Sequence, residues 1–338
     1  MSALFPQITL SECNDASASA ALLPLPRLRM LRLSVTDLCN FRCRYCMPLM
    51  GVPQLQHKEI LSLEQLAELV WWLTAHVGIE RVRLTGGEPL VRQGIEHLIA
   101  QISSFPGIKE VSLTTNGSLL QQKAWALKAA GLKRVNVSLD SLDADRFAEI
   151  TRGGKLKHAL AGIEAARDAG LTPLRINTVL QRSTWRQEVP ALLDYAAETG
   201  YEVRFIELMR MGTERQWCES ELVTVDEVQR ELDVEMVSIE NQSHAPAQRT
   251  LIYWHGTSVQ VGWITPRSHP FCSRCERLRL DARGQLRRCL MDPSVFPLSR
   301  TLAEKDAPAA WKAFQKYVAQ KAAPQAMDSP TAMNQVGG

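Results

Sequence analysis

Six of the eight cysteines fall into two groups of three. The first group is Cys39, Cys43 and Cys46, and the second is Cys272, Cys275 and Cys289. The first twenty residues carry Glu12 and Asp15 and no apolar run, so no secretory signal is expected. Disulfides are rare in chains that stay in a reducing compartment. The grouped thiols therefore point to metal chemistry, and the two remaining cysteines, Cys13 and Cys218, are expected to be free thiols.

The spacing of the first group brings three thiolates within eight residues, close enough to surround one metal centre. A structural zinc site requires four ligands, and a cubane iron–sulfur cluster is also usually held by four cysteines. Three interpretations stay open. The loop holds zinc through a remote fourth ligand, with His57 the nearest candidate, or it carries reduced thiols only. Alternatively, it holds an iron–sulfur cluster in which one iron is open to another molecule.

The second group raises the same choice in a strongly basic setting. His269 lies three residues before Cys272 and could complete a zinc site, whereas a second iron–sulfur cluster would again have an open iron. The arginines between these cysteines are Arg274, Arg277, Arg279, Arg283, Arg287 and Arg288. Guanidinium groups pair bidentately with phosphate oxygens, which predicts an anionic, phosphorylated substrate. A solvated basic face or a nucleic-acid footprint is the alternative, but Phe271 is the patch's only aromatic residue, so nucleic acid is not expected.

Composition sets the broader class of protein. The chain has 338 residues, of which 45% are hydrophobic and 22% charged, and its formal net charge is +3, so a folded globular protein is expected. No run approaches the ~20 apolar residues of a membrane span. The glycine-rich fingerprints of dinucleotide-binding and P-loop proteins are absent from the sequence.

Alternating apolar runs and helical patterns predict an α/β fold. The expected strands are 28–35, 81–84, 110–114, 134–139, 175–180 and 203–208, and the expected helices between them are 63–77, 95–102, 120–130, 156–169 and 189–198. Polar and glycine residues gather where the strands end, as in barrel enzymes. We therefore expect a partial (β/α)6 barrel of the TIM type with a smaller C-terminal, cluster-binding part.

The extent of this alternation of strands and helices divides the sequence into four expected segments. These are an N-terminal arm (1–26), the partial barrel (27–211), a C-terminal part (212–321) that ends in a helix over 309–321, and a tail (322–338) that ends in Gly337 and Gly338. The composition of the tail favours disorder.

The first cysteine group, with Tyr45 before its third member, resembles the radical S-adenosylmethionine superfamily. The Gly-Gly-Glu-Pro run at 86–89, one strand later, is similar to the second motif of that superfamily. The resemblance implies that the open iron chelates S-adenosylmethionine, whose sulfonium is cleaved on reduction to a 5′-deoxyadenosyl radical. In that case the two glycines let backbone atoms approach the methionine closely.

Both cysteine groups together resemble the GTP 3′,8-cyclase family of molybdenum cofactor biosynthesis. The matching segments are 32–37, 83–89, 114–117, 134–143, 204–209, 271–280 and the final Gly-Gly. The resemblance implies two 4Fe-4S clusters, one on Cys39, Cys43 and Cys46 and one on Cys272, Cys275 and Cys289. The implied S-adenosylmethionine contacts are Tyr45, Gly87, Ser138 and Met209. The implied GTP contacts are Arg32, Arg83, Thr114, Arg175, Arg277 and Arg279.

The resemblance also implies the reaction. The radical removes the ribose 3′ hydrogen, and the 3′ carbon then bonds to guanine C8, giving a 3′,8-cyclised dihydroguanosine triphosphate. A related two-cluster enzyme acting on another nucleotide or on a peptide is the alternative, and a zinc-stabilised nucleotide- or nucleic-acid-binding module is the hypothesis from a different class. Expected partners are GTP, a low-potential electron donor such as flavodoxin or ferredoxin, and a downstream cyclic pyranopterin monophosphate synthase. A homodimer is compatible with the resemblance, and a cytoplasmic location is expected.

Three positions depart from the pattern of that family. Arg175 stands where the family usually has lysine, Glu276 stands where it often has asparagine, and 245–247 read Ala-Pro-Ala in place of Gly-Pro-Ala. A carboxylate at Glu276 would repel a triphosphate unless its side chain turns away. The resemblance further implies that Gly337 and Gly338 reach back into the barrel.

Overall fold

The computed structural model describes residues 25–211, 215–239, 245–304, 307–322, 328–329 and 333–335. Most of the expected N-terminal arm, Cys13, and the terminal Gly337 and Gly338 lie outside the described residues, so the predictions about them are not addressed by this structure. Among the described helices, none combines the length and the apolar character needed to cross a membrane.

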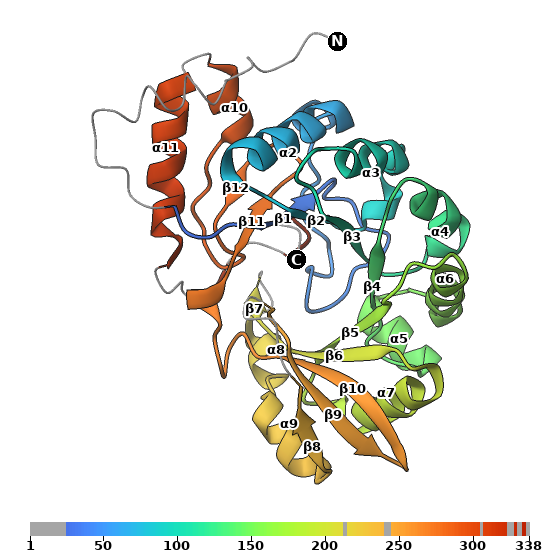
Figure 1. The fold of residues 1–338 in the computed structure, drawn as a ribbon. Helices are drawn as coiled ribbons and strands as arrows, with labels where there is room; N and C mark the ends of the chain where they lie inside the picture. The colour runs from blue at the N-terminus through green and yellow to red at the C-terminus, as the bar shows by residue number, and fades with distance from the viewer. Residues whose placement is uncertain are drawn as a thin grey trace.

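Six parallel strands form the centre of the fold, as the sequence predicts. They are β1 (Met30–Ser34), β2 (Arg81–Thr85), β3 (Glu110–Thr115), β4 (Arg134–Ser138), β5 (Arg175–Leu180) and β6 (Glu202–Glu207). Each pairs in parallel with the next. The helices between them are α2 (Leu63–Val77), α3 (Ile95–Ser103), α4 (Leu120–Ala129), α5 (Ala144–Thr151), α6 (Leu156–Asp168) and α7 (Trp185–Thr199), with short 3-10 turns η2 (His57–Glu59) and η3 (Pro89–Val91). These helices surround the outside of the curved sheet (Figure 1).

The helix boundaries follow from local chemistry. Ser62 begins α2 as an N-cap: its hydroxyl accepts from the amide of Gln65, whose side chain accepts in return from the Ser62 amide. Gly78 ends the same helix in the left-handed region at φ 82°, a conformation that costs glycine least. Asp143 caps the start of α5, where its carboxylate accepts a hydrogen bond from the Arg146 amide.

The C-terminal part adds strands to both edges of the barrel sheet. On one edge β11 (Arg277–Leu280) runs parallel to β1 and pairs with β12 (Leu286–Arg287). On the other edge β10 (Thr257–Ile264) runs parallel to β6 and is followed by antiparallel β9 (Gln248–Trp254) and β8 (Met236–Ser238). The resulting order is β12-β11-β1-β2-β3-β4-β5-β6-β10-β9-β8, an open sheet of eleven strands. The expected partial barrel is confirmed, and the domain boundary expected at 211 stays a prediction, because both parts share this sheet.

Within the described residues, the C-terminal part contains nine further short elements and helices. They are β7 (Arg210–Met211), α8 (Arg215–Ser220), α9 (Val225–Leu232), η4 (Cys272–Arg274), α10 (Leu298–Ala303), α11 (Ala307–Ala319), η5 (Gln320–Ala322), β13 (Asp328–Ser329) and η6 (Met333–Gln335). Trp311 and Phe314 of α11 pack edge-on against Trp72 of α2, with ring centroids 5.8 and 5.4 Å apart. Aromatic packing of this kind fixes the last long helix to the barrel.

Side chains alternate in polarity along the barrel strands. On β1, Leu31 and Leu33 are fully buried in the hydrophobic core, whereas Arg32 between them lines a cavity inside the barrel. On β2, Val82 and Leu84 flank Arg83 in the same way. Because successive side chains of a strand point to opposite faces, the apolar core lies between sheet and helices. The barrel interior is thereby left for polar and charged groups.

Candidate functional site

One cavity inside the barrel, about 330 Å³ in volume, brings the two cysteine groups together. Its walls include all six of the predicted ligand cysteines, Cys39, Cys43, Cys46, Cys272, Cys275 and Cys289. None of the described cysteines is in a disulfide. Two loops separated by more than 200 residues of sequence therefore face a single interior space.

The loop of the first cysteine group is fixed from two sides. It follows β1, and the amides of Arg42 and Arg44 donate to the carbonyls of Thr151 and Ile150 at the end of α5, both at 3.1 Å. On the other side, the Gly87 amide donates to the Thr36 carbonyl at 2.9 Å. A Cβ at this glycine would lie 2.3 Å from the Leu38 carbonyl oxygen, so only glycine fits here.

A buried carboxylate joins the glycine motif to the next strand. Glu88, 1% exposed, accepts from the Leu90 amide (3.0 Å), the Thr115 hydroxyl (2.7 Å) and the Asn116 amide (2.8 Å). Burial raises the pKa of Glu88 to about 7, although these donors oppose the shift. The carboxyl group therefore holds the ends of β2 and β3 in one arrangement beside the first cysteine loop.

A second buried acid orients Tyr45. The tyrosine hydroxyl donates to Asp140 at 2.7 Å, and the other carboxylate oxygen of Asp140 accepts from the Val179 amide at 2.9 Å. Burial raises the pKa of Asp140 to about 6. This contact links the cysteine loop to the ends of β4 and β5.

The first cysteine group sits in a setting that disfavours bare thiolates. Burial raises the pKa of Cys39 to about 11 and that of Cys46 to about 12, and it also raises the pKa of Cys43. Thiolate is the form that binds metal, so binding at this group must displace protons. Three thiols on the wall of one cavity fit a cubane cluster in which the fourth iron is bound by another molecule.

The second cysteine group differs in its electrostatics. Cys272 opens η4, Cys275 follows it, and Cys289 comes after β12. Burial opposes ionisation of Cys275, but Arg277 and Lys321 outweigh it and lower the pKa of this thiol to about 7. A thiolate at Cys275 is therefore accessible near neutral pH, which also fits an iron–sulfur ligand.

The zinc alternative finds no support at this second group. The His269 ring lies 2.9 Å from the Asp226 carboxylate, is largely exposed, and is not part of the cavity wall. Within the described part of the chain, no three His, Cys, Asp or Glu side chains converge closely enough for a single metal ion.

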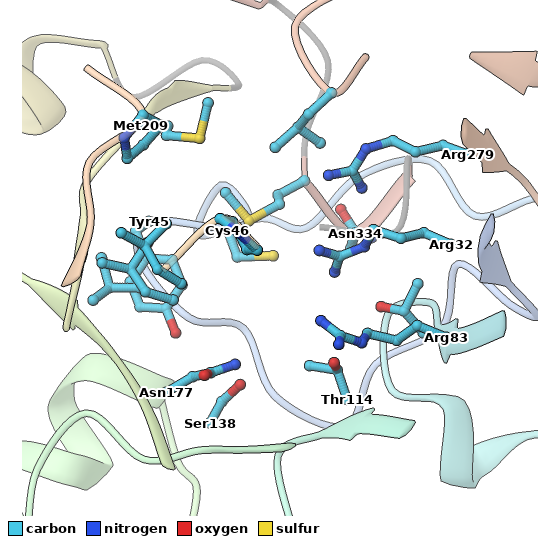
Figure 2. Close-up of a pocket in the computed structure, with 18 of the residues that line it drawn as sticks. Arg32, Tyr45, Cys46, Arg83, Thr114, Ser138, Asn177, Met209, Arg279 and Asn334 are labelled. Atoms are coloured by element: carbon cyan, nitrogen blue, oxygen red, sulfur yellow. The ribbon is translucent and has the colours of Figure 1, made fainter. Parts of the chain in front are cut away.

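Arginines line one wall of the cavity in register. Arg32 of β1 is the Cα partner of Arg279 on β11 and of Arg83 on β2. Figure 2 shows these three guanidinium groups side by side and directed toward the middle of the cavity, opposite Tyr45 and Met209. Burial is the largest cause, and neighbouring arginines a further cause, of the lowered pKa of Arg32 and Arg83. Several cations crowded on one wall predict an anionic occupant.

The other predicted contacts divide into two groups. Tyr45, Gly87, Thr114, Ser138, Met209 and Arg277 all line the cavity. Arg175 is not among the lining residues: its Nε donates to Glu202 at 3.1 Å, and the Arg204 guanidinium shares that carboxylate. Glu276 also turns away, forming ion pairs with Arg27 (2.9 Å) and Arg81 (3.3 Å). The repulsion expected at Glu276 is therefore relieved by pairing outside the cavity.

Sequence reasoning missed several wall residues. Arg204, Asn177, Lys321 and Asn334 also line the cavity. Arg204 and Asn177 lie at inward positions of β6 and β5 and are Cα partners, a signal that strict alternation along the strands could have given. Asn334 donates to the Asp37 carbonyl at 3.1 Å, and the Met333 amide donates to the Cys46 carbonyl at 3.2 Å. Residues 333–335 of the predicted tail are thus placed against the first cysteine loop.

Comparisons with known proteins agree with this geometry. A model of the Radical SAM superfamily matches residues 33–196, and a model described as Molybdenum Cofactor Synthesis C matches residues 201–327. A GTP 3′,8-cyclase of Pelotomaculum thermopropionicum is 46% identical over 279 residues, which cover 82% of this chain and 86% of the relative. A GTP 3′,8-cyclase of Moorella thermoacetica is 41% identical and covers 92% of this chain and 98% of its own.

A solved structure shares the fold. SuiB of Streptococcus suis, crystallised with S-adenosylmethionine, aligns with a TM-score of 0.55 at 15% identity over 89% of this chain and 66% of its own. The superfamily model and the open barrel place the protein among the radical S-adenosylmethionine proteins. Within that class, the chain belongs to the GTP 3′,8-cyclase family.

Proposed function

We propose that this chain catalyses the radical cyclisation of GTP to the 3′,8-cyclised dihydroguanosine triphosphate, the first step of molybdenum cofactor biosynthesis. The observation that carries the proposal is the single cavity that holds both cysteine groups and the arginine wall. A nucleoside triphosphate is an anion of the size and charge that such a wall can bind.

The cysteine groups are proposed to hold the two clusters of the family. Cys39, Cys43 and Cys46 would carry one 4Fe-4S cluster, and Cys272, Cys275 and Cys289 the other. When reduced and bound to S-adenosylmethionine, the first cluster supplies a 5′-deoxyadenosyl radical. Tyr45, Gly87, Ser138 and Met209, which line the cavity on the side of the first loop, are proposed to hold S-adenosylmethionine.

The substrate is proposed to lie against the opposite wall. Arg32, Arg83, Thr114, Arg277 and Arg279 surround the space between the cysteine groups and would orient GTP. Arg204 extends the same cationic surface along the barrel interior. A GTP contact for Arg175 stays a prediction, because the structure places that side chain on Glu202.

The proposal also includes the setting of the enzyme. Clusters with an open iron require a low-potential electron donor, such as a flavodoxin or ferredoxin, and a reducing compartment, for which we propose the cytoplasm. The product would pass to a cyclic pyranopterin monophosphate synthase.

Isotope transfer is the most direct test. Protein reconstituted without oxygen should hold about eight irons per chain, at four per cubane. With dithionite, S-adenosylmethionine and GTP deuterated at the ribose 3′ carbon, we expect deuterium in the released 5′-deoxyadenosine. A cyclised nucleotide should form in equal amount. Release of 5′-deoxyadenosine without deuterium would indicate a different substrate.

The zinc hypothesis is tested in the same preparation. Metal analysis should find iron rather than zinc, and His269→Ala should leave the iron content unchanged, because this ring is held by Asp226. Zinc in place of iron, lost on substitution of His269, would instead support the binding-module hypothesis.

A further inference from the structure

A buried lysine at the end of the last long helix lies beside the second cysteine group. Lys321 belongs to η5, directly after α11, and is only 6% exposed. Lysine is rarely buried this far, because removing an ammonium from water is costly unless acceptors replace the water. This position therefore requires partners inside the protein.

The acceptors of Lys321 belong to two different segments. Its Nζ donates to the Arg288 carbonyl at 2.6 Å and to the Cys275 Sγ at 3.5 Å. Cys275 ends the loop that begins at Cys272, and Arg288 directly precedes Cys289. One side chain thus connects the two stretches of chain that provide all three sulfurs of the group.

The end of the helix is itself fastened to this region. The Arg288 guanidinium donates to the Gln320 side chain at 2.6 Å and lies 4.7 Å from the Tyr317 ring centroid. The Tyr317 hydroxyl donates to the carbonyls of Leu286 and Ser294, both at 3.1 Å. The position of Lys321 is therefore set by the fold rather than by a flexible surface chain.

Among the residues that the structure describes, no ion pair joins the Lys321 Nζ to an acid. The charged neighbours that line the same cavity include Arg277, Arg279 and Arg288. The cysteine sulfurs are the nearby groups that can carry negative charge. A cation held in such a place is matched to thiolates that are coordinated to a metal.

We propose that Lys321 is a positioning residue for the second iron–sulfur cluster, fastening Cys275 to the segment of Cys289 and donating a hydrogen bond to a ligand sulfur. This inference rests on the proposed function only in so far as the second cysteine group holds a cluster. Hydrogen bonds and positive charge at a ligand sulfur favour the reduced cluster and raise its reduction potential. Fixing both ligand segments also slows the loss of iron.

The experiment isolates the second cluster. In a C39A/C43A/C46A background, reconstituted without oxygen, Lys321→Met removes the donor and the charge but keeps most of the side-chain volume. We expect chelator competition to show about a 10- to 100-fold weaker hold on iron, the usual effect of losing such an outer partner. The midpoint potential, followed by electron paramagnetic resonance, should move lower.

Matched variants complete the test. Lys316→Met removes an exposed lysine from α11, the helix directly before η5, and should change neither measurement. Lys321→Gln keeps a donor without the charge and should lie between the parent and Lys321→Met. If Lys321→Met is too unstable to purify, the comparison of Lys321→Gln with Lys316→Met still shows whether Lys321 affects the iron affinity and the midpoint potential.

The outcomes are distinct. Equal iron affinity and equal potential in the Lys321 and Lys316 variants would overturn the inference. Unchanged cluster properties with weaker GTP binding would also overturn it, by assigning Lys321 to the substrate. Absence of iron from the parent background would instead disprove the second cluster itself, and with it the proposed function.

Discussion

Arg32 and Arg83 are register partners on adjacent parallel strands and both line the cavity, so two guanidinium groups stand side by side on one wall. Burial is the main cause of the lowered pKa of both groups, and each repels further arginines of the same interior. An anion bound at this wall would offset the repulsion among these arginines, so the wall is suited to an anionic ligand.

This relationship predicts opposite effects of one substitution. Arg83→Met should leave the melting temperature of ligand-free protein unchanged or raise it, because one of several mutually repelling guanidinium groups is removed. GTP binding should weaken about 10- to 100-fold, since a charge-assisted hydrogen bond contributes about 1.5–3 kcal/mol. Calorimetric titration and thermal melts with and without GTP measure both effects. Arg300→Met, which removes an arginine side chain that is 81% exposed, should alter neither.

The cluster on the first cysteine group should be removable by substitution without loss of the cluster on the second group. Cys43→Ala should lower bound iron from about eight to about four per chain and abolish formation of 5′-deoxyadenosine. Cys218→Ala serves as the control, because Cys218 is buried outside the cavity wall and should retain full iron. Unchanged 5′-deoxyadenosine yield in Cys43→Ala would remove the proposed radical site.

Glu88 predicts a pH dependence of stability. Its pKa is raised from 4.5 to about 7 in the folded protein, so its favourable contribution is complete below pH 4.5 and is lost as the pH rises toward 7. Between pH 5.5 and 8 this amounts to about 2 kcal/mol of lost unfolding free energy. Glu88→Gln should remove that part of the decline in urea unfolding measured across the range. Parallel pH curves for the two proteins would show that Glu88 does not titrate there.

Gly87 is expected to tolerate no side chain. In Gly87→Ala the new Cβ would press on the Leu38 carbonyl and displace the loop that carries Cys39. We expect weaker S-adenosylmethionine binding and at least tenfold slower cleavage, measured by equilibrium dialysis and by 5′-deoxyadenosine release. Gly51→Ala is the comparison: Gly51 has φ 77° but open space around its Cβ position, so it should cost only about 1 kcal/mol of stability.

The central strands and the cysteine groups are readable from the sequence for a physical reason. Expected strands such as 81–84 and 175–180 are short, apolar on one face and followed by helical periodicity, and these local patterns predict a parallel sheet. The cysteine spacings and the glycines at 86 and 87 are local as well. Each of these features depends on residues that are close in the chain.

The edge strands and part of the cavity wall depend on distant pairings instead. β10 and β11 find their partners β6 and β1 across long stretches of chain, which no local period reports. In the sequence, Lys321 looks like an ordinary polar residue at the end of an amphipathic helix. Its burial depends on how α11 packs, which the sequence does not report. Arg204 lies between two apolar residues of its strand. The sequence alone does not tell which face of that strand lines the barrel, and so does not assign Arg204 to the cavity.

The two strands that flank the barrel carry a consequence for biosynthesis of the protein. β1 and β6 acquire their outer neighbours only from β11 and β10, which lie in the last third of the chain. A nascent polypeptide that has emerged only as far as residue 240 therefore exposes two unpaired edge strands. Such edges are sites at which chains aggregate. The second cysteine group is completed only by Cys289, which follows β10 and β11 along the chain, so its three sulfurs come together only after both edge partners have been synthesised.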